Sequence, residues 1–237
     1  MPQIALGDLI IDVIYKDIKN VHLSVYPPYG RVRISAPLRL GLDTIRMFAI
    51  SRLGWIRKQQ TRLNQQARES AHDFIDRESH YYLGKRYLLK IYEIEAAPKV
   101  ILKHSTIEMQ IRPGTTTEKR KTILDEWYRQ RLKEIIPQII RKWERTLNVN
   151  VKAFGVKKMK TKWGSCNWKA GRIWLNLELA KKPVSCIEYV GVHEMVHLLE
   201  RKHGERFTAH LDKFLPMWKS NKEELNRSPL SHQDWSY

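Results

Sequence analysis

The stretch from residue 185 to residue 203 constrains the fold most, because it combines a helix start with three regularly spaced histidines. Ser185 stands three residues before Glu188, and this spacing predicts a reciprocal capping box at the start of a helix. At about 100° per residue, His193 and His197 share one face of that helix. An apolar stripe that we expect to face the core lies on another side and comprises Val192, Met195, Val196 and Leu199.

The spacing of the two histidines is typical of a metal-binding site. Side chains at positions i and i+4 of a helix can both reach one zinc ion at about 2.0–2.1 Å, and Glu194 can reach a water molecule on that ion. His203 follows His197 by six residues, a spacing that some zinc peptidases use for a third histidine. The pattern therefore predicts His193, His197 and His203 as metal ligands and Glu194 as the catalytic residue.

A continuous helix would turn His203 away from the pair by about 100° or more, so the prediction requires the helix to end near Arg201 or Lys202. Gly204 is available for the turn. Three neutral imidazoles would leave one tetrahedral position for water, which is typical of a catalytic zinc site, whereas Cys166 as a fourth ligand would make the site structural. The alternative interpretation is three histidines on a solvated basic helix.

The net charge of the chain indicates which kinds of binding partner to test. It is +18, and the Lys and Arg residues are spread along the whole length. Polyanions are the partners to test, with nucleic acid first and nucleotide phosphates second, although a solvated basic surface explains the same composition. Cys166 and Cys186 fit a reducing cytosol. The first residues lack the basic start of a secretory leader, and no apolar run reaches the roughly 18 residues of a membrane helix. We expect a cytoplasmic protein with no membrane association.

Short apolar runs separated by turn residues dominate the first 114 residues. The runs within residues 9–37 predict an antiparallel meander, and apolar residues at helical spacing predict one long helix from residue 42 to about residue 68. Further strands are predicted over residues 82–94, 100–103 and 107–111. We therefore expect residues 1–114 to form an amino-terminal, antiparallel, strand-rich region with one long helix.

The rest of the chain begins with a second long helix, which Thr116 or Thr117 caps and which Pro137 should kink. Its polar side is rich in Lys and Arg, which favours a solvated face and leaves contact with a nucleic-acid backbone as the alternative. Strands are predicted over residues 149–159 and 172–177. Another helix follows Gly204, with Pro216 bending it or starting a new segment, and a loosely held tail begins at residue 226. We expect residues 115–237 to form the metal-hydrolase core.

The hairpin before the metal helix holds the candidate substrate-binding residues. In zinc peptidases such a strand commonly borders the cleft and accepts an extended substrate by edge pairing. The candidates are Trp163, Gly164, Ser165, Arg172 and Asn176. Gly164 permits a close approach to the backbone, but a packed turn beneath the metal helix explains the segment 163–166 equally well.

Four segments taken together resemble one family. They are Lys160-Thr161-Lys162-Trp163-Gly164-Ser165-Cys166, Leu175-Asn176, His193-Glu194-Met195-Val196-His197 and His203-Gly204-Glu205-Arg206-Phe207. The combination resembles the bacterial YgjP-like metallopeptidases, relatives of the SprT-like and Wss1-like proteases. The resemblance covers nearly the whole chain.

This resemblance implies an α+β fold with a minimal zincin-like core, in which a small twisted sheet accompanies an active-site helix. It implies one Zn²⁺ per chain held by His193, His197 and His203, with Glu194 as general base, and leaves room for another divalent ion. The implied activity is that of a zinc-dependent metallopeptidase, in which Glu194 activates water on the ion, with a peptide or protein as substrate.

Two further functions fit the same residues. The metal centre could serve a nucleoside triphosphate pyrophosphohydrolase, with basic residues holding the phosphates of the nucleotide. Alternatively, the chain binds nucleic acid through its basic surface and the metal is structural, although no recognised binding motif supports this. We prefer the metallopeptidase, which could act on proteins near nucleic acid as the SprT-like relatives do.

Overall fold

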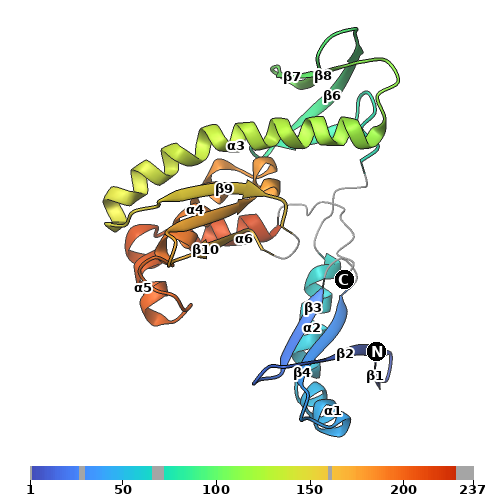
Figure 1. Cartoon of the computed structure of the whole chain (residues 1–237), viewed down its shortest axis with the longest axis vertical. Coiled ribbons are helices and arrows are strands. Elements are labelled where there is room, and N and C mark those ends of the chain that lie inside the picture. Colours follow the sequence, from blue (N-terminus) through green and yellow to red (C-terminus); the bar gives the residue numbers. More distant parts are fainter. Residues whose placement is uncertain (1, 27–29, 66–71, 160–161, 228–237) are drawn as a thin grey trace. The chain divides into compact units, whose positions relative to one another are not determined.

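The computed structural model describes residues 2–26, 30–65, 72–159 and 162–227 (Figure 1). The chain divides into two compact units, one that includes Met1–Ala71 and one of His72–Ser228. The boundary expected between residues 114 and 115 falls inside the second unit. The physical reason is that the strands before residue 114 and the long helix after it bury their apolar side chains in one common core.

The first unit is a four-stranded sheet with two helices. Its strands lie in the order β1-β2-β4-β3. The elements are β1 (Gln3–Leu6), β2 (Leu9–Lys16), β3 (His22–Tyr26), β4 (Arg31–Pro37), α1 (Leu42–Ser51) and α2 (Leu53–Gln65). One long helix was predicted here, but the helix is interrupted at Arg52, whose φ of −106° and ψ of 4° depart from helical values. The predicted end near residue 68 lies outside the described residues.

The predicted antiparallel meander is wrong at one pair of strands, because β2 and β4 are parallel. Their register places Val13 opposite Ile34 and aligns two apolar faces. Those side chains are fully buried together with apolar residues of α1 and α2. Strand alternation is visible in the sequence, but the order in which strands pair is not, since it depends on which faces the tertiary core buries.

The second unit starts with another four-stranded sheet, in the order β5-β6-β8-β7 with β6 and β8 parallel. Its strands are β5 (Ser79–Tyr82), β6 (Lys85–Glu93), β7 (Lys99–Leu102) and β8 (Thr106–Ile111). Helix α3 (Thr117–Leu147) packs its apolar side into the same core. Thr116 caps α3, as predicted, by accepting a hydrogen bond from the Lys119 amide. Pro137 lies within α3 and does not end it.

The remaining elements build the region that carries the histidines. A three-stranded sheet has the order β10-β11-β9, with β9 and β11 parallel. The elements are β9 (Ala153–Lys157), β10 (Gly164–Asn167), β11 (Arg172–Asn176), the 3₁₀ helix η1 (Leu177–Lys181), α4 (Val184–Val196), α5 (Glu205–Phe214) and α6 (Trp218–Arg227). Helix α4 packs against α3, α6, β10 and β11. Pro216 separates α5 from α6, in keeping with the prediction, and residues 228–237 of the predicted tail lie outside the described residues.

The predicted α+β class is confirmed, since helices and three small mixed sheets make up the described chain. Among the described helices, none combines the length and the apolar character that crossing a membrane requires. Of residues 115–237, for which a metal-hydrolase core was predicted, the described residues lie in the second unit, together with the strands that precede α3.

Candidate metal centre

Helix α4 starts differently from the prediction. Pro183 occupies the N-cap position and no side chain caps the helix, so Ser185 already lies inside the first turn and cannot act as the cap. Its hydroxyl group instead lies 3.4 Å from a carboxylate oxygen of Glu224. Glu188 accepts hydrogen bonds from Lys142 and Trp143 of α3, at 2.7 and 2.8 Å. The predicted capping box is therefore wrong, and both of its residues tie α4 to neighbouring helices.

Helix α4 is buried on almost every side. The residues between Cys186 and Val196 are buried with two exceptions, Glu188 and His193, which are half-buried. The predicted apolar stripe holds for Val192, Met195 and Val196 but not for Leu199, which is 43% exposed and lies beyond the helix. A central helix surrounded by other elements needs apolar side chains all round, so a single stripe underestimates its burial.

The helix also ends earlier than predicted. Its last residue is Val196, and His197 is the C-cap, whereas the spacing of the histidines placed the end near Arg201 or Lys202. Tight backbone hydrogen bonds close this end, including one of 2.8 Å from the Glu200 amide to the Val196 carbonyl. The chain then turns back, and Gly204 becomes the N-cap of α5. The early end gives the intervening segment room to bring His203 back toward α4.

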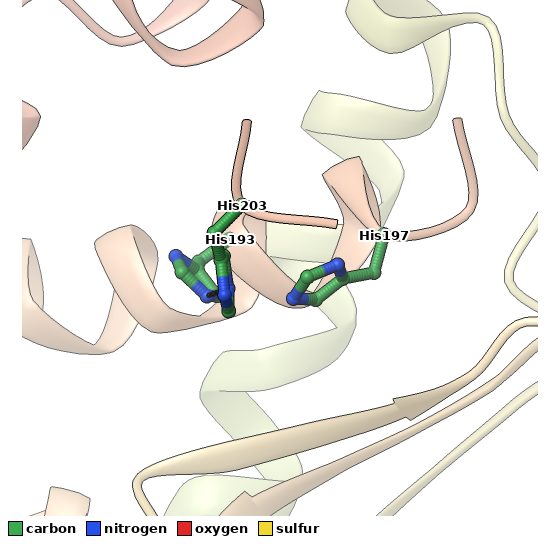
Figure 2. Close-up of side chains that lie close together, drawn as sticks. All are labelled: His193, His197 and His203. Atoms are coloured by element: carbon green, nitrogen blue, oxygen red, sulfur yellow. Dashed lines mark hydrogen bonds between the residues drawn. The ribbon is translucent and has the colours of Figure 1, made fainter. Parts of the chain in front are cut away.

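The three predicted histidine ligands lie together (Figure 2). Each offers a ring nitrogen, and these atoms all lie within 4.8 Å of one another. Nε2 of His193 and Nε2 of His203 are 2.9 Å apart. In a tetrahedral site with bonds of about 2.0–2.1 Å, two nitrogen ligands are about 3.3 Å apart, so a small adjustment would accommodate an ion.

Phe207 of α5 holds the three rings in place. Its ring centroid lies 4.9 Å from that of His193, 4.8 Å from that of His197 and 4.7 Å from that of His203. Phe207 is buried, with 3% of its surface exposed. An apolar ring against all three imidazoles fixes their orientation without competing for a ligand position.

The protonation states of the imidazoles also suit a metal. Burial, followed by the neighbouring His197 and His203, lowers the pKa of His193 to about 3, and burial lowers the pKa of His197. Nδ1 of His197 lies 3.1 Å from the carbonyl oxygen of Glu200; a proton on Nδ1 leaves the Nε2 lone pair available. Nδ1 of His193 is buried without a hydrogen-bond partner in the described chain. Neutral imidazoles of this kind fit a borderline-soft divalent ion such as zinc.

Cys166 does not belong to this group of donors, although a fourth, thiolate ligand was an alternative. Burial, and then the nearby Glu194, raise the pKa of its thiol to about 11. The histidine group therefore resembles an open three-ligand site.

Glu194 lies beside the start of β10. A Cβ atom added at Gly164 would stand 2.6 Å from Oε1 of Glu194 and 2.7 Å from its Cγ. Glu194 is buried, and burial raises the pKa of its carboxyl group to about 7, although Lys162 acts in the opposite direction. A carboxyl group with a pKa near neutrality can both accept and release a proton.

Asn176, at the end of β11, has a structural role in the hairpin of β10 and β11. The segment predicted from Lys160 is described only from Lys162 onward, because residues 160 and 161 lie outside the described residues. Asn176 is buried, and its amide donates hydrogen bonds to the carbonyl oxygens of Met159 and Lys162, at 2.9 and 2.8 Å. Its Oδ1 accepts from the amide of Glu178 at 3.2 Å. Asn176 thus fixes the backbone on both sides of the segment that leads to β10.

A cleft of about 500 Å³ lies over the histidines and Glu194. Trp163, Gly164 and Ser165 line it, whereas Arg172 and Asn176 are not part of the lining. Gly164 also packs against Glu194 of α4, so the segment has features of both interpretations, the substrate-binding segment and the packed turn. Several lining residues were not predicted from sequence: Lys162, Trp168, Tyr189, Val190, Arg201, Lys222, Leu225 and Asn226. Tyr189 stands one helical turn before His193, so the helical period could have identified it.

A second group of potential ligands lies elsewhere in the second unit and consists of His72, Glu78 and His80. The Glu78 carboxylate accepts hydrogen bonds from the amides of Asp73 and Phe74, and the two imidazoles lie 3.1 and 3.0 Å from its oxygens. The two imidazole rings are stacked, with ring centroids 4.4 Å apart, and the ligand atoms of this group also lie within 4.8 Å of one another. The Glu78 carboxylate thus already has hydrogen-bond partners within its own segment. These contacts hold the segment before β5 in place.

Three histidines at one end of a central helix, beside a small sheet in which β11 is the one neighbour of β10 among the described strands, are typical of zincin-like metal-dependent hydrolases. Residues 19–228 match the family model described as YgjP-like, metallopeptidase domain. Because this match covers most of the chain, the protein belongs to the YgjP-like metallopeptidase family. None of the curated proteins compared with the chain matches it.

Proposed function

We propose that the protein is a zinc-dependent peptidase in which His193, His197 and His203 hold the ion. One observation carries the proposal. The three imidazoles converge within 4.8 Å, and the same cleft is lined by Glu194. Membership in a metallopeptidase family supports a metal-dependent hydrolase and a peptide or protein substrate.

The bound ion and Glu194 would have different roles in peptide hydrolysis. A zinc ion held here would polarise the substrate carbonyl group and lower the pKa of water toward 7. Glu194 accepts the proton that water loses as its oxygen attacks the carbonyl carbon, and it donates this proton to the nitrogen of the leaving amine. The raised pKa of Glu194, about 7, suits both steps because neither form of the carboxyl group is strongly disfavoured at neutral pH.

The edge of β10 offers a binding place for an extended peptide. Among the described strands, β10 pairs with β11 alone, and the backbone N–H of Asn176 donates to the Trp163 carbonyl oxygen at 2.8 Å. Since hydrogen-bonding residues alternate in an antiparallel pair, the backbone groups of Gly164 and Cys166 are directed away from β11. They are available to pair with a substrate strand, whose scissile bond would then lie beside Glu194.

The test compares wild type with Glu194→Gln on casein-like peptides and on nucleoside triphosphates, with bound metal measured in both proteins. We expect wild type to hold one zinc per chain and to cleave peptides. Glu194→Gln should retain the zinc and lose activity by at least about 100-fold. Glu205→Gln, the same change at an exposed position in the first turn of α5, is the matched control and should keep full activity.

A nucleoside triphosphate is the second candidate substrate, and the cationic side chains of Lys162, Arg201 and Lys222 in the cleft favour it. Pyrophosphate release that depends on Glu194, without peptide cleavage, would establish that alternative. Manganese or magnesium would then compete with zinc, although three imidazoles prefer a borderline-soft ion.

Binding of nucleic acid by a protein with a structural metal is the third hypothesis. On α3, Arg131 pairs with Glu134 and Lys142 with Glu188, so part of the basic helix face is already neutralised. Association with nucleic acid through the remaining basic surface is compatible with the peptidase, and a steep salt dependence of binding would reveal it.

Two free cysteines are in accord with a cytoplasmic protein.

A further inference from the structure

The cleft over the metal centre has an unbalanced charge. Three cationic side chains line it, those of Lys162, Arg201 and Lys222, and Glu194 is the one carboxyl group among the described lining residues. Within the described part of the chain, none of the three cations forms an ion pair. A cleft of this kind attracts negatively charged groups of a substrate.

Arg201 is the cation with the most defined position. Its guanidinium carbon lies 3.3 Å from the ring centroid of Trp168, which is itself 40% exposed. Stacking on an indole fixes the plane of the guanidinium group and leaves its N–H edges free for a planar anion. Arg201 also lies in the segment between two candidate ligands, His197 and His203, so its place relative to the metal centre is set by the same turn.

The direction of β10 tells which part of a peptide would meet Arg201. Glu194 lies at Gly164, the first residue of β10, and Trp168 follows its last residue. A peptide that pairs antiparallel to β10 with its scissile bond beside Glu194 extends its amino-terminal part toward Trp168. At about 3.4 Å per residue, Trp168 lies about 14 Å along the strand from Gly164, and the long arginine side chain shortens this span.

We propose that Arg201, stacked on Trp168, is a specificity-determining residue that binds an acidic side chain of the peptide substrate. The acidic residue stands about two to four positions on the amino-terminal side of the cleaved bond. A guanidinium group and a carboxylate form two parallel N–H···O hydrogen bonds, which selects a carboxylate over an amide of the same shape. This inference rests on the proposed peptidase function.

The test uses three peptides that differ only at one position before the cleaved bond, which carries Glu, Gln or Lys. Wild type should cleave the Glu peptide with a kcat/KM about three- to tenfold higher than the Gln peptide, and the difference should shrink as salt rises. Arg201→Glu should invert the order and favour the Lys peptide. Lys213→Glu, the same reversal at an exposed position on α5 outside the cleft lining, should keep the wild-type order.

Two further variants separate specificity from folding. Arg201→Lys keeps the charge but loses the planar fork, so it should show a reduced preference for the Glu peptide. Trp168→Ala removes the surface that positions Arg201 and should lower the ratio of Glu to Gln cleavage. A defect of folding or of metal binding would lower both rates together and leave the ratio unchanged, and bound zinc is measured in each variant.

The outcomes distinguish this inference from the proposed function. Equal cleavage of the three peptides, still dependent on Glu194, would overturn the role of Arg201 and leave the peptidase intact. A preference for Glu that persists in Arg201→Glu would also overturn it. Failure to cleave any peptide would overturn both proposals. An inverted preference in Arg201→Glu alone supports the inference.

Discussion

The side chain of Glu194 fills the space in which a Cβ atom of residue 164 would stand, with Oε1 only 2.6 Å from that position. The glycine of β10 and the glutamate of α4 are therefore fitted to each other. The close approach explains why the edge strand can pass directly beside the carboxyl group that we propose to move the proton.

The first prediction concerns this contact. Gly164→Ala should lower the free energy of unfolding by about 1–3 kcal/mol, because the added methyl group overpacks a buried site. It should also reduce peptide cleavage by about 100-fold, since a displacement of about 1 Å at a catalytic group has that effect. Bound zinc should be retained. Gly54→Ala, where the added methyl group has no neighbour within 4 Å, is the control, and an equal loss in both variants would contradict the account.

The second prediction concerns the number of metal ions. Alanine at His193, His197 or His203 should each lower bound zinc from one per chain to well below one, measured by elemental analysis after dialysis. Glu78→Gln should leave the zinc content unchanged, because the carboxylate of Glu78 already accepts hydrogen bonds from its own loop. Loss of zinc in Glu78→Gln with the histidine centre intact would show that the second group binds metal.

The third prediction concerns Asn176. Replacement by alanine removes two hydrogen bonds to backbone carbonyl groups and the acceptor of the Glu178 amide in a buried place. We expect a loss of about 2–4 kcal/mol in the free energy of unfolding, since buried groups are left unpaired. Asn167→Ala, an exposed asparagine with one amide contact, should cost less than about 1 kcal/mol. Equal stability of Asn176→Ala and wild type in chemical denaturation would refute this role.

The fourth prediction is a dependence on pH in the first unit. The Gln3 amide, and also Arg31 and Arg33, hold the pKa of the buried Asp12 carboxyl group below its ordinary value of 3.8. Because the folded-state pKa is lowered, the stabilisation is complete above pH 3.8 and is lost as the pH falls through the lower folded value. Asp12→Asn should thus destabilise by about 1–2 kcal/mol at pH 7 and by much less near pH 2.

Calorimetric unfolding at the two pH values measures this difference. Asp17→Asn changes an exposed carboxyl group of the same unit and should have little effect at either pH. A constant cost of Asp12→Asn at both pH values would rule out the linkage.

The clustering of His193 and His197 could be predicted from the sequence because it depends on local structure. Residues four apart on a helix share a face whatever the rest of the chain does. His203 was found by its distance from His197 and requires only that the helix end between them. The end itself was misplaced, because backbone hydrogen bonds that close α4 at Val196 leave no mark in side-chain periodicity.

The cleft was harder to predict because separate loops form it. Trp168 follows β10 and Arg201 follows α4, and no spacing in the sequence relates them. Asn176 was one of the candidate substrate-binding residues, but it is buried and hydrogen-bonded to the backbone. The parallel pairing of β2 with β4 was likewise hidden, since alternation of apolar residues describes a strand and not its neighbour.

X-ray absorption at the zinc edge of the zinc-loaded protein tests the central claim most directly. The account predicts a site with three imidazole nitrogens at about 2.0–2.1 Å, one further light-atom ligand and no sulfur, and a loss of one imidazole in His203→Ala. A sulfur ligand at about 2.3 Å, or a spectrum that is unchanged in His203→Ala, would contradict it.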